Sequence, residues 1–168
     1  MRKSCDAMRE LLADDGAFDQ DSMLAYVDAD VRSGSALLTV LATLALLVRP
    51  SLLLMIYMGH SREVPNELPV LRFLTGPDAT LGAVRLAPLL RACRATTTVV
   101  VLECCKSTGV FDSISFSGLI VVPVCGKSQN VPVGFTRDIL VPVLRGQCDQ
   151  AVLKCKNFVT NSNGRITL

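Results

Sequence analysis

Three short runs of the sequence consist almost entirely of apolar and β-branched residues, and each has the length of a β-strand: Leu52–Met58, Thr96–Leu102 and Leu119–Val124. β-Branched residues dominate the second and third runs, as in strands that are buried on both faces. The segments between the runs are long enough for helical crossovers. Buried strands joined by helices pair in parallel, so we expect an α/β fold with a mostly parallel sheet flanked by helices.

Shorter patterns complete the expected set of elements. The Ser35 hydroxyl could cap the helix expected at Ala36–Val48. Thr136 could cap the helix expected at Thr136–Leu144, and Pro142 should end that helix early. Apolar spacing predicts helices at Asp6–Leu12, Ala36–Val48, Leu81–Ala92 and Thr136–Leu144, and composition predicts short strands at Met23–Val27 and Val70–Leu74.

The size and charge of the chain limit both its domain number and its partners. Its 168 residues, half of them apolar, are enough for one buried core, so we expect a single domain over residues 1–168. A net charge of +2, the absence of Trp and an aromatic content of 5% provide neither a basic field nor a stacking surface. We therefore expect no nucleic-acid partner. The sequence does not indicate an oligomeric state.

The cysteines and the single histidine bear on metal binding and on the compartment. Seven cysteines include the vicinal pair Cys104 and Cys105 but no CxxC pair, and one histidine cannot complete a Cys2His2 set. We therefore expect no metal and no cofactor. An odd number of cysteines and an N-terminus without an apolar leader favour a reducing compartment, so the predicted location is cytoplasmic.

One apolar stretch, Ala36–Met58, has the length of a membrane-spanning helix. Arg49 and Pro50 interrupt it, because a charge is costly in a bilayer and Pro removes a helical hydrogen-bond donor. A buried helix followed by a buried strand is the favoured interpretation, which makes a membrane partner unlikely. A membrane-anchored protein stays open as an alternative of lower rank.

Two reactive side chains follow neighbouring predicted strands. His60 comes two residues after Met58, and Cys105 comes three residues after Leu102. The carboxyl ends of parallel strands lie at one edge of a sheet, so an imidazole and a thiol could meet there as a Cys–His dyad. The neighbouring Lys106 adds positive charge that favours a thiolate. The alternative from the residues alone is a structural histidine and an inert, buried cysteine.

Around these two residues the sequence resembles the caspase-fold cysteine peptidases, and the metacaspases in particular. Tyr57-Met58-Gly59-His60-Ser61 is similar to the strand and Ser-Gly-His-Gly signature of the family, and Val100–Ser107 is similar to its strand and Asp-x-Cys-His-Ser-Gly signature. The two signatures occur in the family's order. The interval from histidine to cysteine is close to the roughly 50 residues of caspases. The resemblance implies a caspase-like three-layer sandwich with a mostly parallel sheet.

The resemblance also implies a role for each matching residue. Cys105 would be the nucleophile and His60 the general acid and base, with the amides of Ser61 and Cys105 forming an oxyanion hole. Glu103 would lie in the specificity pocket, and Ser51 stands where the family has a second acidic residue of that pocket. The implied activity is a thiol protease that cleaves polypeptide substrates after basic P1 residues. Calcium activation is common in metacaspases, but no residues here can be assigned to a calcium site.

The sequence departs from the family at several positions. Ser61 and Lys106 replace the glycine after the histidine and the histidine after the cysteine, and Thr108 separates Ser107 from Gly109. The first central strand of the family has no counterpart before the first predicted helix. These departures favour an alternative of a different class, a catalytically inactive caspase-like module that acts as a regulatory or binding protein.

Overall fold

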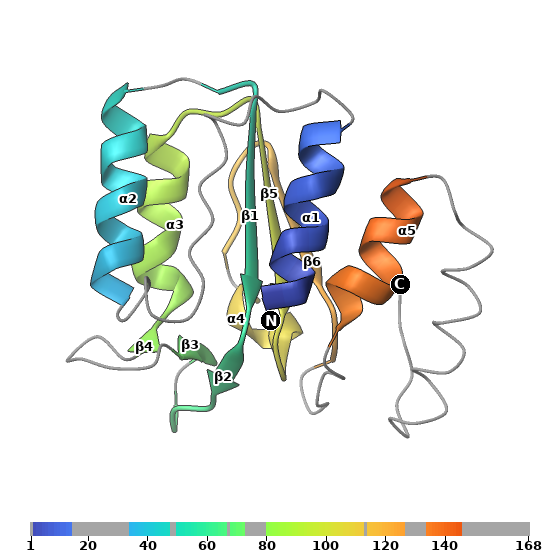
Figure 1. The fold of residues 1–168 in the computed structure, drawn as a ribbon. Coiled ribbons are helices and arrows are strands. Elements are labelled where there is room, and N and C mark those ends of the chain that lie inside the picture. The colour runs from blue at the N-terminus through green and yellow to red at the C-terminus, as the bar shows by residue number, and fades with distance from the viewer. Residues whose placement is uncertain are drawn as a thin grey trace. The chain divides into compact units, whose positions relative to one another are not determined.

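A computed structural model of the chain describes residues 2–14, 34–47, 50–66, 68–72, 80–112, 114–126 and 134–145. The chain divides into two compact units (Figure 1): the first unit combines Met1–Asp30 with Val131–Leu168, and the second unit is Val31–Asn130. Every candidate site residue lies in the second unit. The strand expected at Met23–Val27 lies outside the described residues.

The centre of the second unit is a parallel sheet of three strands in the order β1-β5-β6, and all three were expected. β1 spans Leu52–Met58, β5 spans Thr97–Glu103 and β6 spans Leu119–Pro123. Every position of β5 from Val100 to Glu103 is buried, which explains why the strand carries no charged residue before Glu103. The register pairs Met58 with Glu103, and Leu102 with Pro123.

Helices flank this sheet, as expected for an α/β fold. α2 spans Gly34–Leu47, α3 spans Ala83–Ala92 and the short α4 spans Ser107–Val110; α2 and α3 lie side by side (Figure 1). Apolar side chains of the helices and the strands share one core, whose buried members are Leu41, Tyr57, Leu71, Leu81, Ala83, Leu86, Leu90, Val100, Leu102, Cys104, Val110 and Phe111. Ser35 lies inside the first turn of α2, so its predicted place as the cap was wrong.

A small antiparallel sheet follows β1 directly. It consists of β2 (His60–Arg62), β3 (Val70–Arg72) and β4 (Thr80–Leu81), paired in the order β2-β3-β4. Leu81 was expected to begin the third helix but belongs to β4, where it is fully buried against the core. Gly82 ends the strand in an extended conformation, and α3 therefore begins at Ala83.

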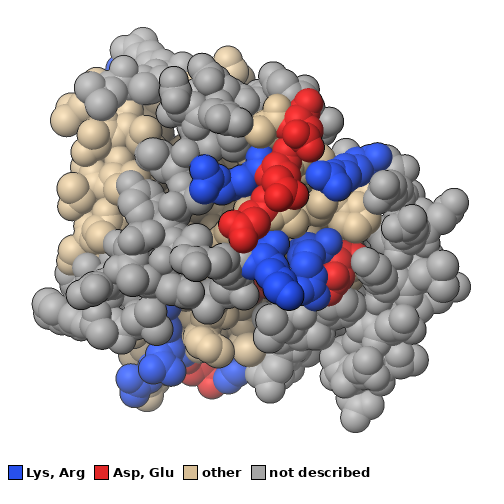
Figure 2. Space-filling view, viewed as in Figure 1, with Lys and Arg blue, Asp and Glu red and all other residues tan. Residues whose placement is uncertain are grey.

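The first unit contains α1 (Arg2–Asp14), the π-helix η2 (Thr136–Leu140) and α5 (Val141–Leu144), and α1 packs against the other two. α1 buries Met8 and Leu11 and exposes charged residues of both signs, which mix on the surface in Figure 2. Two sequence predictions were wrong here. Thr136 is a buried residue inside the π-helix rather than a cap, and Pro142 sits in the first turn of α5, where its missing N–H is tolerated.

The apolar stretch at residues 36–58 is split between α2 and β1, with Pro50 between them. Of the helices in the described ranges, none is both long enough and apolar enough to cross a membrane. The stretch therefore takes the form expected from Arg49 and Pro50, a helix followed by a strand.

Candidate active site

The carboxyl ends of β1 and β5 bring the two candidate catalytic residues to the same edge of the sheet. Met58 pairs with Glu103, and the next amide, that of Gly59, donates to the carbonyl of Glu103 at 3.1 Å. His60 and Cys105 each lie two residues beyond the paired positions. The Ser61 hydroxyl donates a hydrogen bond to the carbonyl of Cys105, which joins the two segments directly.

The side chains of the pair differ in exposure. His60 begins β2 and is exposed, whereas Cys105 is half-buried in the turn between β5 and α4. Within the described residues, no hydrogen bond joins the His60 ring to the Cys105 thiol. The structure thus places the two residues at one edge of the sheet without a direct bond between the reactive atoms.

The two residues predicted for the specificity pocket lie far apart. Glu103 is the last residue of β5 and is only 6% exposed. Ser51 precedes β1 at its amino end, where its carbonyl accepts from the amide of Thr97 at 3.0 Å. At about 3.3 Å per residue, the strand between these ends is about 20 Å long. The structure therefore does not bring Ser51 and Glu103 together.

Tyr57 fixes the backbone on either side of the candidate histidine. Its hydroxyl oxygen lies 2.7 Å from the carbonyl oxygen of His60 and 2.6 Å from that of Arg72, and it accepts from the Arg72 amide at 3.2 Å. Burial raises the pKa of the Tyr57 phenol well above its ordinary value, and the nearby Cys104 adds to this effect. The phenol therefore stays protonated and links β2 to β3 beside His60. A lone aromatic residue in an aliphatic strand was the only sequence signal for this role.

Two further thiols accompany Cys105 at this edge. Cys104 is fully buried, and burial, together with the neighbouring Cys125 and Cys105, raises the pKa of its thiol to about 12, while a hydrogen bond from Ser61 opposes the change. The Cys125 thiol donates to the carbonyl of Cys104, with 3.1 Å between the sulfur and the oxygen. Neither Cys104 nor Cys125 was assigned a role at this edge from the sequence. The available signal was that Cys125 directly follows the predicted strand Leu119–Val124.

Ser107 and Thr108 attach the segment after β6 to the turn that carries Cys105. The Ser107 hydroxyl accepts from the amide of Cys125 at 2.9 Å and lies 3.0 Å from its carbonyl oxygen. The Thr108 hydroxyl and amide both donate to the same carbonyl, at 2.6 Å and 3.1 Å. Thr108, which departs from the family signature, therefore holds the loop of Cys125 in place.

Lys106 occupies a special backbone conformation in the same turn. Its φ of 54° lies in the left-handed region, which costs free energy for any residue with a side chain. Its ammonium lies 2.6 Å from a carboxylate oxygen of Glu63. The Lys106 charge, which was expected to favour a Cys105 thiolate, is therefore paired with the carboxylate of Glu63 in the loop after β2.

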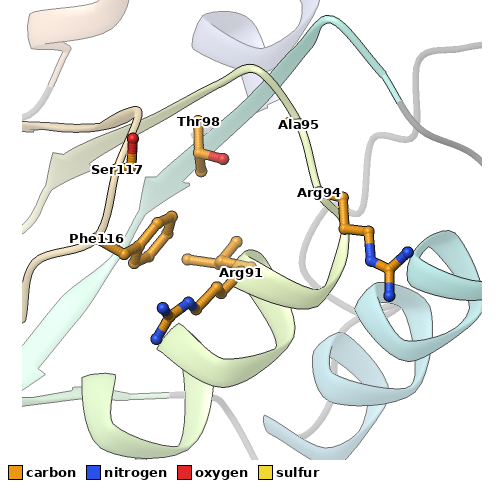
Figure 3. Close-up of a pocket in the computed structure, with 7 residues that line it drawn as sticks. Arg91, Arg94, Ala95, Thr98, Phe116 and Ser117 are labelled. Carbon is orange, nitrogen blue, oxygen red and sulfur yellow. The ribbon is translucent and has the colours of Figure 1, made fainter.

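A hollow of about 190 Å³ lies at the other end of β5. Figure 3 shows Arg91 extending beside the Phe116 ring and Arg94 pointing away from that ring. The lining residues are Leu90, Arg91, Arg94, Ala95, Thr98, Phe116 and Ser117. None of the candidate catalytic residues contributes to this hollow, so it is separate from the candidate active site.

The described part of the chain holds no group of three or more His, Cys, Asp or Glu side chains arranged to bind a metal ion. A comparison of the sequence with known protein families finds no family that matches, and a comparison with curated proteins finds no significant relative.

Proposed function

We propose that this chain is a caspase-like cysteine endopeptidase of the metacaspase type, a single domain over residues 1–168 that acts on polypeptide substrates in the cytoplasm. The observation that carries the proposal is the position of His60 and Cys105 at one edge of a parallel sheet, joined through the Ser61 hydroxyl. The carboxyl edge of such a sheet is where α/β proteins bind their ligands.

In the proposed reaction His60 removes the proton from the Cys105 thiol, and the thiolate sulfur attacks the carbonyl carbon of the scissile peptide bond. The amides of Ser61 and Cys105 donate hydrogen bonds to the oxyanion that forms. His60 then gives its proton to the leaving amine, and a thioester on Cys105 remains. Water, deprotonated by His60, hydrolyses the thioester and restores the thiol. No cofactor takes part in these steps.

Glu103 supplies the proposed preference for Arg or Lys at P1, because its carboxylate stands two residues before the nucleophile. A carboxylate pairs with a guanidinium through two charge-assisted hydrogen bonds, which favours a basic over an acidic P1 side chain. Ser51 takes no part in this preference, since it lies at the opposite end of β1.

The test is covalent labelling of the full chain with a peptidyl chloromethyl ketone that carries Arg at P1. We expect mass spectrometry to find the label on Cys105, and we expect Cys105→Ala and His60→Ala each to reduce hydrolysis of a fluorogenic Arg substrate at least 100-fold. Cys5→Ala is the matched control, because Cys5 is a half-buried cysteine outside this site. Glu103→Gln should reduce the preference for Arg over a neutral P1 residue.

A second candidate function is an inactive caspase-like module that binds or regulates other proteins. The specific observation in its favour is that the His60 ring and the Cys105 thiol make no hydrogen bond to each other in the described structure. A folded chain that is neither labelled at Cys105 nor active on basic peptides would replace the peptidase proposal with this one.

A further inference from the structure

Two cysteines follow β5 and β6 at matching distances from the last pair of their register. Leu102 pairs with Pro123, a bridge that the amide of Val124 completes by donating to the carbonyl of Leu102 at 3.2 Å. Two residues further along each strand stand Cys104 and Cys125. Neighbouring strands are about 4.8 Å apart, and disulfides join Cα atoms at about 4.4–6.8 Å. Continued at that strand spacing, the two Cα atoms fall within the range that a disulfide spans.

The side-chain contacts agree with this spacing. The Cys125 sulfur lies 3.1 Å from the carbonyl oxygen of Cys104, and it is close enough to the Cys104 thiol to contribute to the raised pKa of that thiol. Ser107 and Thr108 hold the backbone of Cys125 through its amide and its carbonyl, so its position beside Cys104 is fixed. Both cysteines are reduced in the structure.

We propose that Cys104 and Cys125 form a reversible disulfide that links the ends of β5 and β6 next to Cys105. This goes beyond the proposed peptidase activity and does not depend on it, since it requires only the two thiols and an oxidant. The oxidant is a small-molecule disulfide such as glutathione disulfide. Cys125 is the entry point because it is half-buried, whereas Cys104 is fully buried.

The reaction consists of two thiol–disulfide exchanges. The Cys125 thiolate attacks glutathione disulfide, which forms a mixed disulfide and releases one glutathione thiolate. The Cys104 thiolate then attacks the Cys125 sulfur and releases the second glutathione thiolate. Two protein thiols are oxidised by two electrons and one glutathione disulfide is reduced to two thiols. Because the pKa of Cys104 is about 12, little of its thiol is ionised at neutral pH. The mixed disulfide of Cys125 with glutathione should therefore accumulate before the Cys104–Cys125 bond forms.

Cys105 competes with Cys104 as the partner of Cys125 in the disulfide. The Cys125 sulfur contacts the carbonyl of Cys104, and that carbonyl belongs to the peptide bond between Cys104 and Cys105. The structure favours Cys104 for two reasons. Cys104 is the residue that meets Cys125 when the β5–β6 register is continued beyond Leu102 and Pro123, whereas Cys105 already lies in the turn that leads to Lys106. The experiment must therefore distinguish two adjacent residues.

The test oxidises the reduced full chain with glutathione disulfide, blocks the remaining thiols with N-ethylmaleimide and digests with trypsin without reduction. Cleavage after Arg94, Lys106 and Lys127 places Cys104 and Cys105 in one peptide, residues 95–106, and Cys125 in another, residues 107–127. We expect these two peptides to be linked, with N-ethylmaleimide on Cys105 by fragment-ion sequencing. Mixing unlabelled and ¹⁵N-labelled chains should give no hybrid pairs, because the bond forms within one chain.

Three results would overturn the assignment: no link between the two peptides, N-ethylmaleimide on Cys104 instead of Cys105, or hybrid isotope pairs in equal amount to the pure pairs. The Cys105→Ser variant should keep the link, and Cys125→Ser should lose it. Because the wild-type chain alone locates the bond, a variant that fails to fold does not affect the outcome.

Discussion

At the scale of single residues, the path of the backbone from β1 to His60 depends on the close packing of Gly59 against Tyr57. A Cβ atom at Gly59 would lie 2.7 Å from the Tyr57 hydroxyl oxygen and 2.9 Å from the ring carbon that carries it. The phenol is buried and is held by the backbone of His60 and Arg72, so it has little room to move. The glycine before His60 is therefore required by packing.

Gly59→Ala should reduce the free energy of unfolding by about 1–3 kcal/mol, the usual cost of forcing an extra carbon into a packed site. Urea denaturation followed by circular dichroism measures the change. Gly82→Ala is the matched control, since the nearest atom to a Cβ there is a Val70 methyl at 3.6 Å, and its cost should stay below about 1 kcal/mol. Equal losses in the two variants would contradict the role of Tyr57.

At the scale of secondary-structure elements, the sequence is sufficient to locate the strands of the parallel sheet. β1 has the expected bounds, β5 is shifted by one residue at both ends, and β6 ends one residue early. Burial on both faces leaves a continuous apolar run, which is visible without the structure. The short strands β2 and β4 have two or three residues, too few for any periodicity to show, and the sequence does not reveal them.

The candidate site was predicted only in part, for a related reason. The predicted strands place His60 and Cys105 after their ends and Ser51 before the first of them, but they do not contain the β5–β6 register that brings Cys125 beside Cys104. Register depends on pairing between distant segments. The hydrogen bonds of Ser107 and Thr108 to Cys125 follow from that register, so they too required the structure.

α3 contains a proline that gives a prediction at this scale. Pro88 is exposed in the middle of the helix, where it has no N–H to donate to the carbonyl of Val84. Pro88→Ala restores that donor, so we expect the free energy of unfolding to rise by about 1–3 kcal/mol. The thermal midpoint should rise accordingly. Arg91→Ala, an exposed position of the same helix, should change the free energy by less than about 1 kcal/mol. A destabilised Pro88→Ala would show instead that α3 is adapted to its proline.

At the scale of the whole molecule, the second unit has a core of its own. Among the described residues, that core draws on α2, α3, α4 and the strands β1, β3, β4 and β5, all within Val31–Asn130. The β1–β5 and β5–β6 ladders also lie within it. A compact unit of about 100 residues with its own core is within the size range that folds independently.

We therefore expect a fragment of residues 31–130 to fold without the first unit. Its unfolding in urea should be a single cooperative transition, because one core joins both sheets and the helices. Circular dichroism and intrinsic tyrosine fluorescence should report the same midpoint, since Tyr57, the only tyrosine of the fragment, lies in that core. The fragment keeps Cys104 and Cys125, so the linked peptides should also form in it. A broad transition, or midpoints that differ between the two probes, would show instead that the core of the second unit needs the first unit to be complete.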